Sequence, residues 1–199
     1  MRLDEEYCLS EYVDLGRLGD NEKVHIVRNQ VNGVIGVRKY VALDLEEIYL
    51  FLKENPNAYI PKIYECIQTD TNLIVIEEYL SGKNLEEMLK EKYFSEKDAA
   101  DIIICLCNAL YPLHHAKMPV ICRDLKAENV ILTNEGEVKL VDFDIARIYQ
   151  PGKSKDTVMM GTQGYAAPEQ FGFGQTDART DIYAMGVLLN YMLVREFPM

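Results

Sequence analysis

Hydrophobic and polar positions along the first eighty residues follow a pattern that predicts short strands and one helix. The segments VHIVRN and VIGVRKYV, within residues 11–41, are rich in β-branched residues, and the turn-forming QVNG joins them. Two further strands, KIYECIQ and NLIVIEEYL, are joined by TDT. Between the two pairs, the segment ALDLEEIYLFLKEN has apolar residues at spacings of three and four, and Pro56 ends the predicted helix.

The pattern changes at SGKN, so we place a boundary within residues 79–84, between a strand-rich part and a helix-rich part. In the second part, LEEMLKEKY predicts a short helix, and Ser95 with Asp98 predicts the capped start of a long helix that ends near His115. The strands NVILT and EVKLVDF form a predicted hairpin across NEG. Residues 145–166 predict a long loop, and DIYAMGVLLNYML predicts an apolar helix.

Charged and amide side chains lie at the ends of the predicted hairpin. Asn129 and Asp142 should lie close together because the hairpin returns the chain, and their oxygens would suit Mg²⁺. Asp124 would stand nearby, able to accept a proton from a hydroxyl, and Lys126 could steady a phosphoryl group. A base, a cation and metal ligands at these spacings are what phosphoryl transfer needs.

These motifs resemble those of the protein kinases, most closely the bacterial Ser/Thr kinases of eukaryotic type. The family's H-R-D-L-K-x-x-N appears as CRDLKAEN, its D-F-G as DFD and its A-P-E as Ala167-Pro168-Glu169. The aspartate of the family's large central helix matches Asp181 in TDIYAMGVLL. The resemblance covers nearly the whole chain and implies a two-lobed α+β fold. It would have an antiparallel sheet with one helix at 1–80, for nucleotide binding, and a partial, mostly helical lobe at 81–199.

The resemblance also implies roles for residues in the first part. Lys39 matches the lysine that contacts the α- and β-phosphates of ATP, and its helix partner is expected to be Glu47, with Glu46 as the alternative. Backbone groups of Glu78, Tyr79 and Leu80 would contact adenine. Two further positions complete the expected nucleotide site, namely Gly19 in the phosphate loop and a charged gatekeeper, Glu77.

Several features depart from the family pattern. The phosphate loop is LGDNEKV, in which Gly19 alone matches the family's glycines and Asp20 and Glu22 add negative charge. Asp144 replaces the last glycine of D-F-G, where glycine gives backbone freedom, and Cys122 replaces a scaffolding histidine. The chain stops soon after the central helix, so we expect Glu169 to lack its usual arginine partner and to be unpaired. We also expect an uncovered apolar surface that favours self-association.

Composition narrows the function further. The net charge of −11 disfavours binding to nucleic acid or to an anionic membrane surface. Five cysteines without a CxxC pair predict reduced, buried thiols in a cytoplasmic protein. No signal peptide and no apolar run long enough to span a membrane is present in the sequence.

Regulation and specificity also follow from the resemblance. Thr157 is the leading candidate phosphosite, with Thr162 as a second, and Arg123 is of the kind that can hold a phosphorylated residue. The hydroxyl of Thr162, together with Lys126, favours Ser/Thr over Tyr substrates. The three histidines are expected to be ordinary surface or helix-end residues.

The sequence therefore predicts an ATP- and Mg²⁺-dependent Ser/Thr protein kinase, with Asp124 and Lys126 as catalytic residues. The first alternative is a pseudokinase that binds nucleotide or acts as a scaffold, which the poor phosphate loop and Asp144 favour. The intact Lys39, Asn129 and Asp142 oppose that alternative. A small-molecule kinase of related fold is a third possibility, and GTQGYAAPEQ, which resembles a peptide-substrate platform, argues against it.

Overall fold

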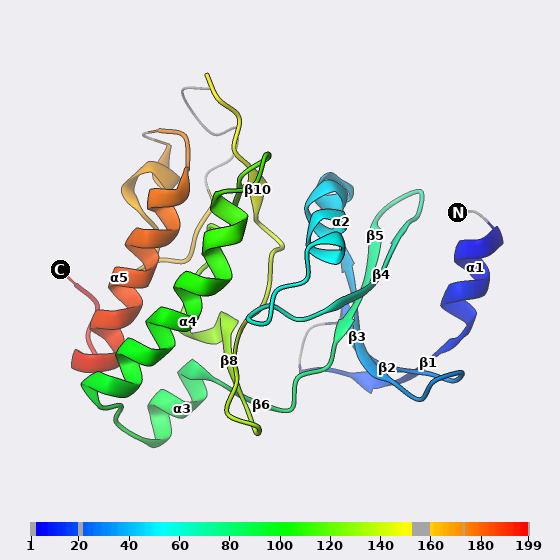
Figure 1. Ribbon diagram of the computed structural model, residues 1–199, viewed down its shortest axis with the longest axis horizontal. Coiled ribbons are helices and arrows are strands. Elements are labelled where there is room, and N and C mark those ends of the chain that lie inside the picture. The colour runs from blue at the N-terminus through cyan, green and yellow to red at the C-terminus, as the bar shows by residue number, and fades with distance from the viewer. Residues whose placement is uncertain (1–2, 20–21, 153–159, 173, 199) are drawn as a thin grey trace. The chain divides into compact units, whose positions relative to one another are not determined.

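The computed structural model describes residues 3–19, 22–152, 160–172 and 174–198 of the chain (Figure 1). The chain divides into two compact units. The first contains residues 1–57 and 61–80, and the second contains residues 58–60 and 81–199. Helices and strands are both present, so the expected α+β class is confirmed.

The first unit is built on a five-stranded antiparallel sheet with the strand order β1-β2-β3-β5-β4. Its strands are β1 (Tyr12–Arg17), β2 (Val24–Asn29), β3 (Ile35–Val41), β4 (Ile63–Gln68) and β5 (Leu73–Glu78). Strand β5 is hydrogen-bonded to β3 on one side and to β4 on the other, and residues 73–77 of it are all buried. The β-branched run that predicted a strand is therefore the central part of the core.

Two helices accompany this sheet. The expected helix is present as a 3₁₀ turn, η1 (Leu43–Leu45), followed by α2 (Glu46–Glu54), which packs on β4. Its apolar stripe is buried, through Ile48, Tyr49 and Leu52. A second helix, α1 (Leu3–Ser10), was not expected and contacts β1. It has only eight residues and lacks the repeated apolar spacing that identifies a helix in a sequence.

The second unit is mainly helical, with α3 (Leu85–Glu91), α4 (Glu96–His114) and α5 (Ala178–Val194). The predicted cap of α4 is confirmed. The Ser95 hydroxyl accepts from the Asp98 amide at 3.1 Å, and the Asp98 carboxylate accepts from the Ser95 amide at 3.1 Å. Helices α4 and α5 pack against each other, and their shared core includes Leu106, Leu110 and Leu188.

Short strands and turns carry the loops of the second unit. The predicted hairpin is present as β8 (Val130–Thr133) and β9 (Val138–Leu140), and β6 (Gly82–Asn84) adds a third strand beside β8. The unexpected strands β7 (Val120–Ile121) and β10 (Arg147–Ile148) pair with each other. Two 3₁₀ turns, η2 (Ala127–Asn129) and η3 (Pro168–Phe171), complete the elements.

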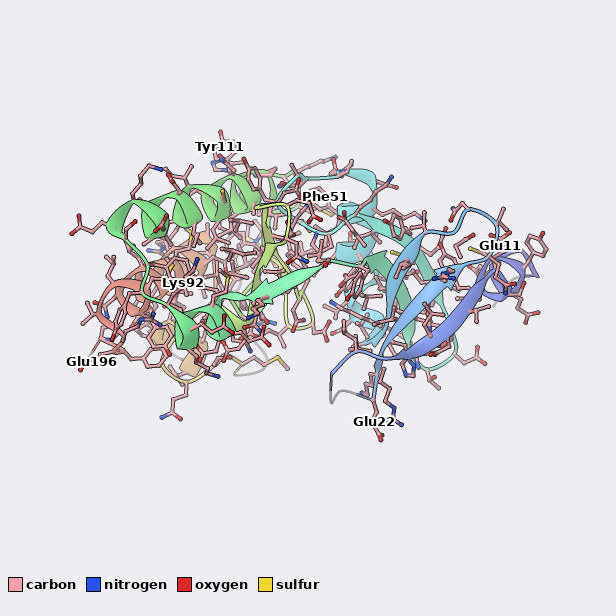
Figure 2. All side chains as sticks on the ribbon, turned by 90° about the horizontal axis from the view of Figure 1, so that it is seen from below. Glu11, Glu22, Phe51, Lys92, Tyr111 and Glu196 are labelled. Carbon is pink, nitrogen blue, oxygen red and sulfur yellow. The ribbon has the colours of Figure 1, made fainter. Side chains whose placement is uncertain are left out.

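Large apolar and aromatic side chains remain on the surface of the second unit. Tyr111 of α4 is 65% exposed and projects from the helix (Figure 2), and Ile182 and Val194 of α5 are more than half exposed. All five cysteines are free thiols, as predicted; Cys122 is buried, Cys107 is exposed, and the other three are half-buried. None of the helices within the described ranges has the length and apolar character needed to cross a bilayer.

Candidate active site

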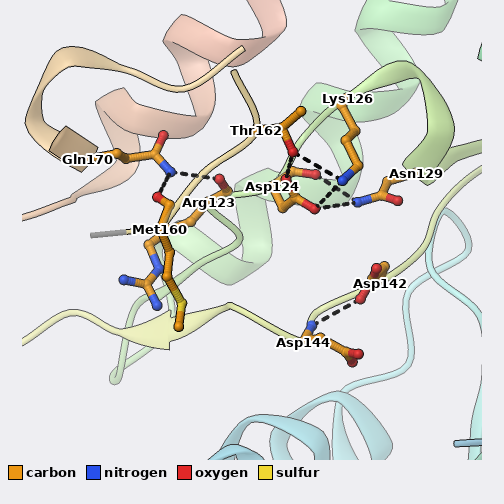
Figure 3. Close-up of polar contacts among 9 residues, drawn as sticks. All are labelled: Arg123, Asp124, Lys126, Asn129, Asp142, Asp144, Met160, Thr162 and Gln170. Carbon is orange, nitrogen blue, oxygen red and sulfur yellow. Dashed lines mark hydrogen bonds and ion pairs between the residues drawn. The ribbon is translucent and has the colours of Figure 1, made fainter. Parts of the chain in front are cut away.

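The carboxylate of Asp124 is the centre of a hydrogen-bonded cluster in the second unit (Figure 3). Lys126 Nζ lies 2.7 Å from Asp124 Oδ2, and Thr162 Oγ1 donates to Asp124 Oδ1 at 2.6 Å. Lys126 Nζ also donates to Thr162 Oγ1 at 3.1 Å, which closes a triangle of three side chains. The cluster therefore joins the loop after β7 to a segment nearly forty residues later in the chain.

Asn129 fixes the same loop from its other end. Its side-chain Nδ2 donates to the Asp124 carbonyl at 2.9 Å and to Asp124 Oδ2 at 3.1 Å. Its backbone carbonyl accepts from the Val141 amide at 2.9 Å, so the residue that follows Val141, Asp142, is brought beside the Asn129 segment. The hairpin thus brings together the two stretches that the sequence predicted to meet.

The chemistry of Asn129 and Asp142 fits a hard divalent cation. Because the amide nitrogen of Asn129 binds Asp124, the amide oxygen is the atom that Asn129 can offer to a cation. Asp142 adds a carboxylate, and oxygen pairs of this kind suit Mg²⁺, which takes its other ligands from water and phosphate. Within the described part of the chain, no cluster of three or more His, Cys, Asp or Glu residues forms a separate metal cage.

The backbone around Asp142 and Asp144 differs from the expectation for this turn. Asp142 has a left-handed φ of 70°, whereas Asp144 is not among the residues with positive φ. The Asp144 amide donates to Asp142 Oδ1 at 3.1 Å, and the Asp144 side chain is exposed. In this conformation, position 144 does not require glycine.

Asp181 of α5 supports the loop that contains Asp124. Its fully buried carboxylate accepts from the amides of Cys122, at 3.0 Å, and Arg123, at 2.9 Å. His114 Nε2, at the end of α4, lies 2.7 Å from Asp181 Oδ2. Arg123 has a φ of 66°, a conformation that is uncommon for a residue with a side chain. The hydrogen bonds from the Cys122 and Arg123 amides to Asp181 stabilise this conformation. His114 is thus a helix-end residue, as expected, but its side chain is buried and bonded.

Cys122 replaces the family's histidine without adding a charge. Burial, with Asp181 nearby, raises the pKa of the Cys122 thiol well above its ordinary value, so the side chain stays neutral. Its amide contributes to the Asp181 contact, and its side chain is part of the core. A neutral cysteine therefore fits this buried position, and its backbone amide bonds to Asp181.

Gln170 is a buried residue that the sequence reasoning missed. Its Nε2 donates to the carbonyls of Arg123, at 2.8 Å, and Met160, at 2.7 Å (Figure 3). Its Oε1 accepts from the Ala167 amide at 3.0 Å. One amide side chain therefore ties the loop before Asp124 to the segment before Thr162. A glutamine beside the A-P-E motif has no distinctive spacing, so nothing in the sequence indicated that Gln170 joins these two segments.

Two neighbouring predictions can also be assessed. The expectation that Glu169 lacks a partner was wrong, because Glu169 Oε1 accepts from the Thr180 hydroxyl at 2.7 Å. Arg123 Nε donates to the Ile145 carbonyl at 2.7 Å, which ties it to the segment after Asp144. Thr157 lies outside the described residues, so its predicted role as a phosphosite stays a prediction.

In the first unit, Lys39 has a different carboxylate partner from the one expected. Lys39 Nζ lies 2.5 Å from Oε1 of Glu77, the predicted gatekeeper on β5. Glu47 is exposed on α2, Glu46 is half-buried, and neither forms an ion pair with another described residue. The predicted Lys39–Glu47 pair was therefore wrong, because strand β5 supplies the carboxylate at a position where the helix was expected to do so.

The remaining residues of the expected nucleotide site lie in the same unit. Gly19 has a φ of 67° and is exposed, and the next residue, Asp20, lies outside the described residues. The Glu78 amide donates to the Lys62 carbonyl at 2.8 Å within the sheet, so an adenine ring would have to use another group of Glu78. Leu80 is half-buried at the end of this unit.

Comparison with known proteins decides the family. The sequence profile of the protein kinase domain matches residues 25–199, which is most of the chain. The chain belongs to the protein kinase family. The two-lobed α+β organisation expected for such a chain agrees with the antiparallel sheet of the first unit and the helices of the second.

Individual relatives are protein kinases from bacteria and a plant, and the two bacterial ones are named as Ser/Thr kinases. The chain is 40% identical over 128 residues to a probable serine/threonine-protein kinase PknB of Corynebacterium glutamicum, covering 62% of this kinase and 19% of the relative. It is 35% identical over 133 residues to serine/threonine-protein kinase A of Synechocystis, covering 61% and 26%. A tobacco mitogen-activated protein kinase kinase, SIPKK, is 27% identical over 206 residues, covering 98% and 57%. The chain thus spans less than two thirds of these relatives' own lengths.

Proposed function

We propose that this kinase-family chain transfers the γ-phosphoryl group of ATP to the hydroxyl of Ser or Thr in a protein substrate. The single observation that carries the proposal is the cluster in which Lys126, Thr162 and Asn129 all bind the carboxylate of Asp124. A carboxylate held at both oxygens by three side chains has a fixed direction, as a group that must accept a proton in a defined geometry requires.

Asp124 retains the capacity to bind a substrate hydroxyl in this arrangement. An ionised carboxylate offers about four acceptor positions, and the three side-chain donors occupy three of them. A fourth donor, the Ser or Thr hydroxyl, could therefore add to the cluster without displacing another residue. In this role Asp124 orients the hydroxyl and accepts its proton as the phosphoryl group is transferred.

Lys126 and Thr162 support the same step. The Lys126 ammonium, 20% exposed and paired with Asp124, would stabilise the negative charge of the phosphoryl group during transfer. The Thr162 hydroxyl donates to Asp124 and accepts from Lys126, so it sets the distance between base and cation. Phosphorylation of Thr162 would remove this bridge, which makes it the weaker of the two proposed phosphosites.

Asn129 and Asp142 would hold Mg²⁺, and Mg²⁺ would neutralise charge on the ATP phosphates when bound. The orientation of the Asn129 amide supports this assignment, because its nitrogen already binds Asp124. In the first unit, we propose Lys39 as the contact to the α- and β-phosphates, with Gly19 in the phosphate loop. Glu78 and Leu80 would contact adenine through the backbone, and residues 1–80 would form the nucleotide-binding lobe.

The second candidate function is a pseudokinase that binds nucleotide with little turnover. The observation that favours it is the phosphate loop, LGDNEKV, in which Gly19 alone matches the family's glycines and Asp20 and Glu22 add negative charge where ATP phosphates would bind. The ordered Asp124 cluster favours turnover instead, since a scaffold would need no oriented base.

Phosphoryl transfer is tested directly with radiolabelled ATP. The chain is incubated with Mg-ATP and a generic Ser/Thr substrate protein, alongside the Asp124→Asn and Asp101→Asn variants. Asp101 is an exposed carboxylate on α4 paired with Lys97, so it is a matched control. We expect label with the parent and the control, on Ser or Thr, and a loss of about a hundredfold or more for Asp124→Asn. Equal label in the parent and Asp124→Asn would overturn the proposal.

Three wider predictions accompany this function. The kinase would act in the cytoplasm, where ATP and protein substrates are present, and would not bind nucleic acid. Exposed apolar residues of α5, including Ile182 and Val194, are consistent with self-association. Each of these stays a prediction.

A further inference from the structure

The ion pair of Lys39 and Glu77 is built into the sheet of the first unit. Lys39 on β3 is directly opposite Val75 on β5, and Glu77 is directly opposite Val37. Lys39 and Glu77 are therefore diagonal neighbours on one face of the antiparallel pair, a separation that long side chains can bridge. Their charged atoms meet at 2.5 Å.

Both members of the pair are shielded from water. The side chain of Glu77 is 7% exposed and that of Lys39 is 13% exposed. The residues opposite Glu77 on the two neighbouring strands are Val37 and Ile63, and both are buried. A carboxylate among apolar neighbours is costly unless it is paired, so the lysine is the group that makes Glu77 tolerable at this position.

The position of Glu77 is fixed by the backbone more firmly than that of a helix residue at the surface. Strand β5 is hydrogen-bonded on both edges, to β3 and to β4, and Glu77 lies within its buried run. Glu47, by contrast, is exposed in the first turn of α2. A lysine bound to Glu77 is therefore placed by the register of the sheet, whatever the position of the helix.

We propose that Glu77 is the residue that positions Lys39 for the phosphates of the nucleotide, in place of a glutamate from α2. This inference rests on the proposed function, because it assigns Lys39 to the ATP phosphates. An ammonium group has three donors, so one can bind Glu77 while another binds phosphate oxygen. Glu77 is thus a positioning residue, which acts through Lys39 and needs no contact with the nucleotide.

The proposal has a consequence for regulation. A lysine positioned by a helix glutamate is lost when the helix moves, so nucleotide binding can be controlled through that movement. A lysine positioned by Glu77 stays in place as long as the sheet is intact. Nucleotide binding by this kinase should then be insensitive to changes in the exposed charges of α2.

Affinity for a non-hydrolysable Mg-ATP analogue, measured by calorimetry, tests the proposal without requiring turnover. We expect Glu77→Gln, which keeps the shape and removes the charge, to weaken affinity about tenfold. Glu65→Gln, on β4 and paired with Lys53, is the matched control and should stay within about twofold. Glu46→Gln and Glu47→Gln should each cost less than Glu77→Gln. A larger loss for Glu47→Gln than for Glu77→Gln would overturn the proposal.

A double-variant cycle separates positioning from a structural role. If Glu77 acts through Lys39, then Glu77→Gln should cause no further loss of affinity in a Lys39→Met background. An equal tenfold loss in both backgrounds would show that Glu77 acts independently of Lys39 and would overturn the proposal.

A second double variant covers the case in which Glu77→Gln fails to fold. Lys39→Met with Glu77→Leu replaces the ion pair by apolar groups and tests whether the site tolerates removal of the pair. That double variant should bind the analogue no more weakly than Lys39→Met, and any further loss would overturn the proposal.

Labelling assays on the same samples keep this proposal distinct from the proposed function. A parent that binds the analogue but transfers no label would overturn the kinase activity, and the affinities would still decide the role of Glu77. A parent that transfers label while Glu77→Gln binds normally would overturn the role of Glu77 alone. A parent that binds no nucleotide would overturn both.

Discussion

Each unit of this kinase contains a lysine paired with a carboxylate, but the two pairs are supported in different ways. In the second unit, Lys126 and Asp124 are two residues apart on a loop. Thr162 contacts both of them, and Asn129 contacts Asp124. In the first unit, Lys39 and Glu77 lie on neighbouring strands, nearly forty residues apart in the chain. The Lys126–Asp124 pair depends on a network of side chains, whereas the Lys39–Glu77 pair depends on the register of the sheet.

This difference explains why the sequence placed Asp124 and Lys126 in one site, whereas the contact of Lys39 with Glu77 was missed. The motif CRDLKAEN contains Asp124, Lys126 and Asn129 within a few residues, so its local spacing is visible in the sequence. The contact of Lys39 with Glu77 depends on β3 and β5 being neighbours and on their register. The positions of Lys39 and Glu77 in the sequence reveal neither that the two strands are neighbours nor how their residues are aligned.

The largest expected effect comes from removing Asp181, which supports the loop of the second unit. Asp181→Ala would leave the amides of Cys122 and Arg123 and the His114 ring without their buried acceptor. We expect a loss of stability on the order of 3 kcal/mol, because each unsatisfied buried donor carries a cost. Urea unfolding measures this loss, and Asp101→Ala, an exposed change on α4, should cause little change.

Hydrogen exchange on the same Asp181→Ala variant sharpens the comparison. Amides 120–130 should exchange faster, whereas the β3 and β5 amides of the first unit should keep their protection. Equal acceleration in both units would contradict the separate support that we assign to the two pairs.

A smaller effect is expected from Thr162, which bridges Lys126 and Asp124. Thr162→Val removes the hydroxyl and keeps the volume, so the rate of phosphoryl transfer at saturating ATP should fall roughly tenfold. Thr162→Ser keeps the hydroxyl and should retain most of the activity. Steady-state kinetics measure both, and an unchanged rate for Thr162→Val would exclude Thr162 from the cluster's function.

The smallest effect concerns the reactivity of thiols in the two units. Burial raises the pKa of the Cys66 thiol, on β4, to about 11, and raises the pKa of Cys122 well above its ordinary value. At pH 8, iodoacetamide should modify the exposed Cys107 first, because the thiolate is the reactive form. Peptide mass spectrometry measures the order, and labelling of Cys66 should rise about tenfold per pH unit up to about pH 10.

The same raised pKa has a consequence for stability. Folding favours the protonated thiol of Cys66, so its contribution is fully present below the unfolded pKa, near 9, and is lost as the pH rises toward about 11. In the iodoacetamide experiment, modification of Cys66 as fast as that of Cys107 at pH 8 would contradict the partial burial of Cys66.

Most of the regular structure could be predicted from the sequence because its signals are local. The Ser95 cap, the apolar face of α4 and the turn NEG each lie within a few residues, and each predicted element is present. Helix α1 could not be predicted, since its eight residues carry no repeated apolar spacing. Strands β7 and β10 have two residues each, too few to leave a pattern.

The parts of the candidate site that could not be predicted are contacts between distant segments. Gln170 binds Arg123 across 47 positions, and His114 binds Asp181 across 67. The family pattern predicted that Glu169 is unpaired, but its carboxylate accepts a hydrogen bond from the Thr180 hydroxyl. In each case the residue type has several possible partners, and only the packing of α4, α5 and the loops between them decides which partner it contacts.

The most direct test of these separate roles, nucleotide binding by Lys39 and proton transfer by Asp124, measures the affinity for the Mg-ATP analogue and the rate of phosphoryl transfer on one variant of each residue. Asp124→Asn should bind the Mg-ATP analogue with unchanged affinity and lose about a hundredfold or more of the transfer rate, because its role lies in the second unit's chemistry. Lys39→Met should lose affinity, because its role lies in holding the phosphates. If both variants lose affinity and rate to the same extent, the assignment of binding to the Lys39–Glu77 pair and of proton transfer to Asp124 is contradicted.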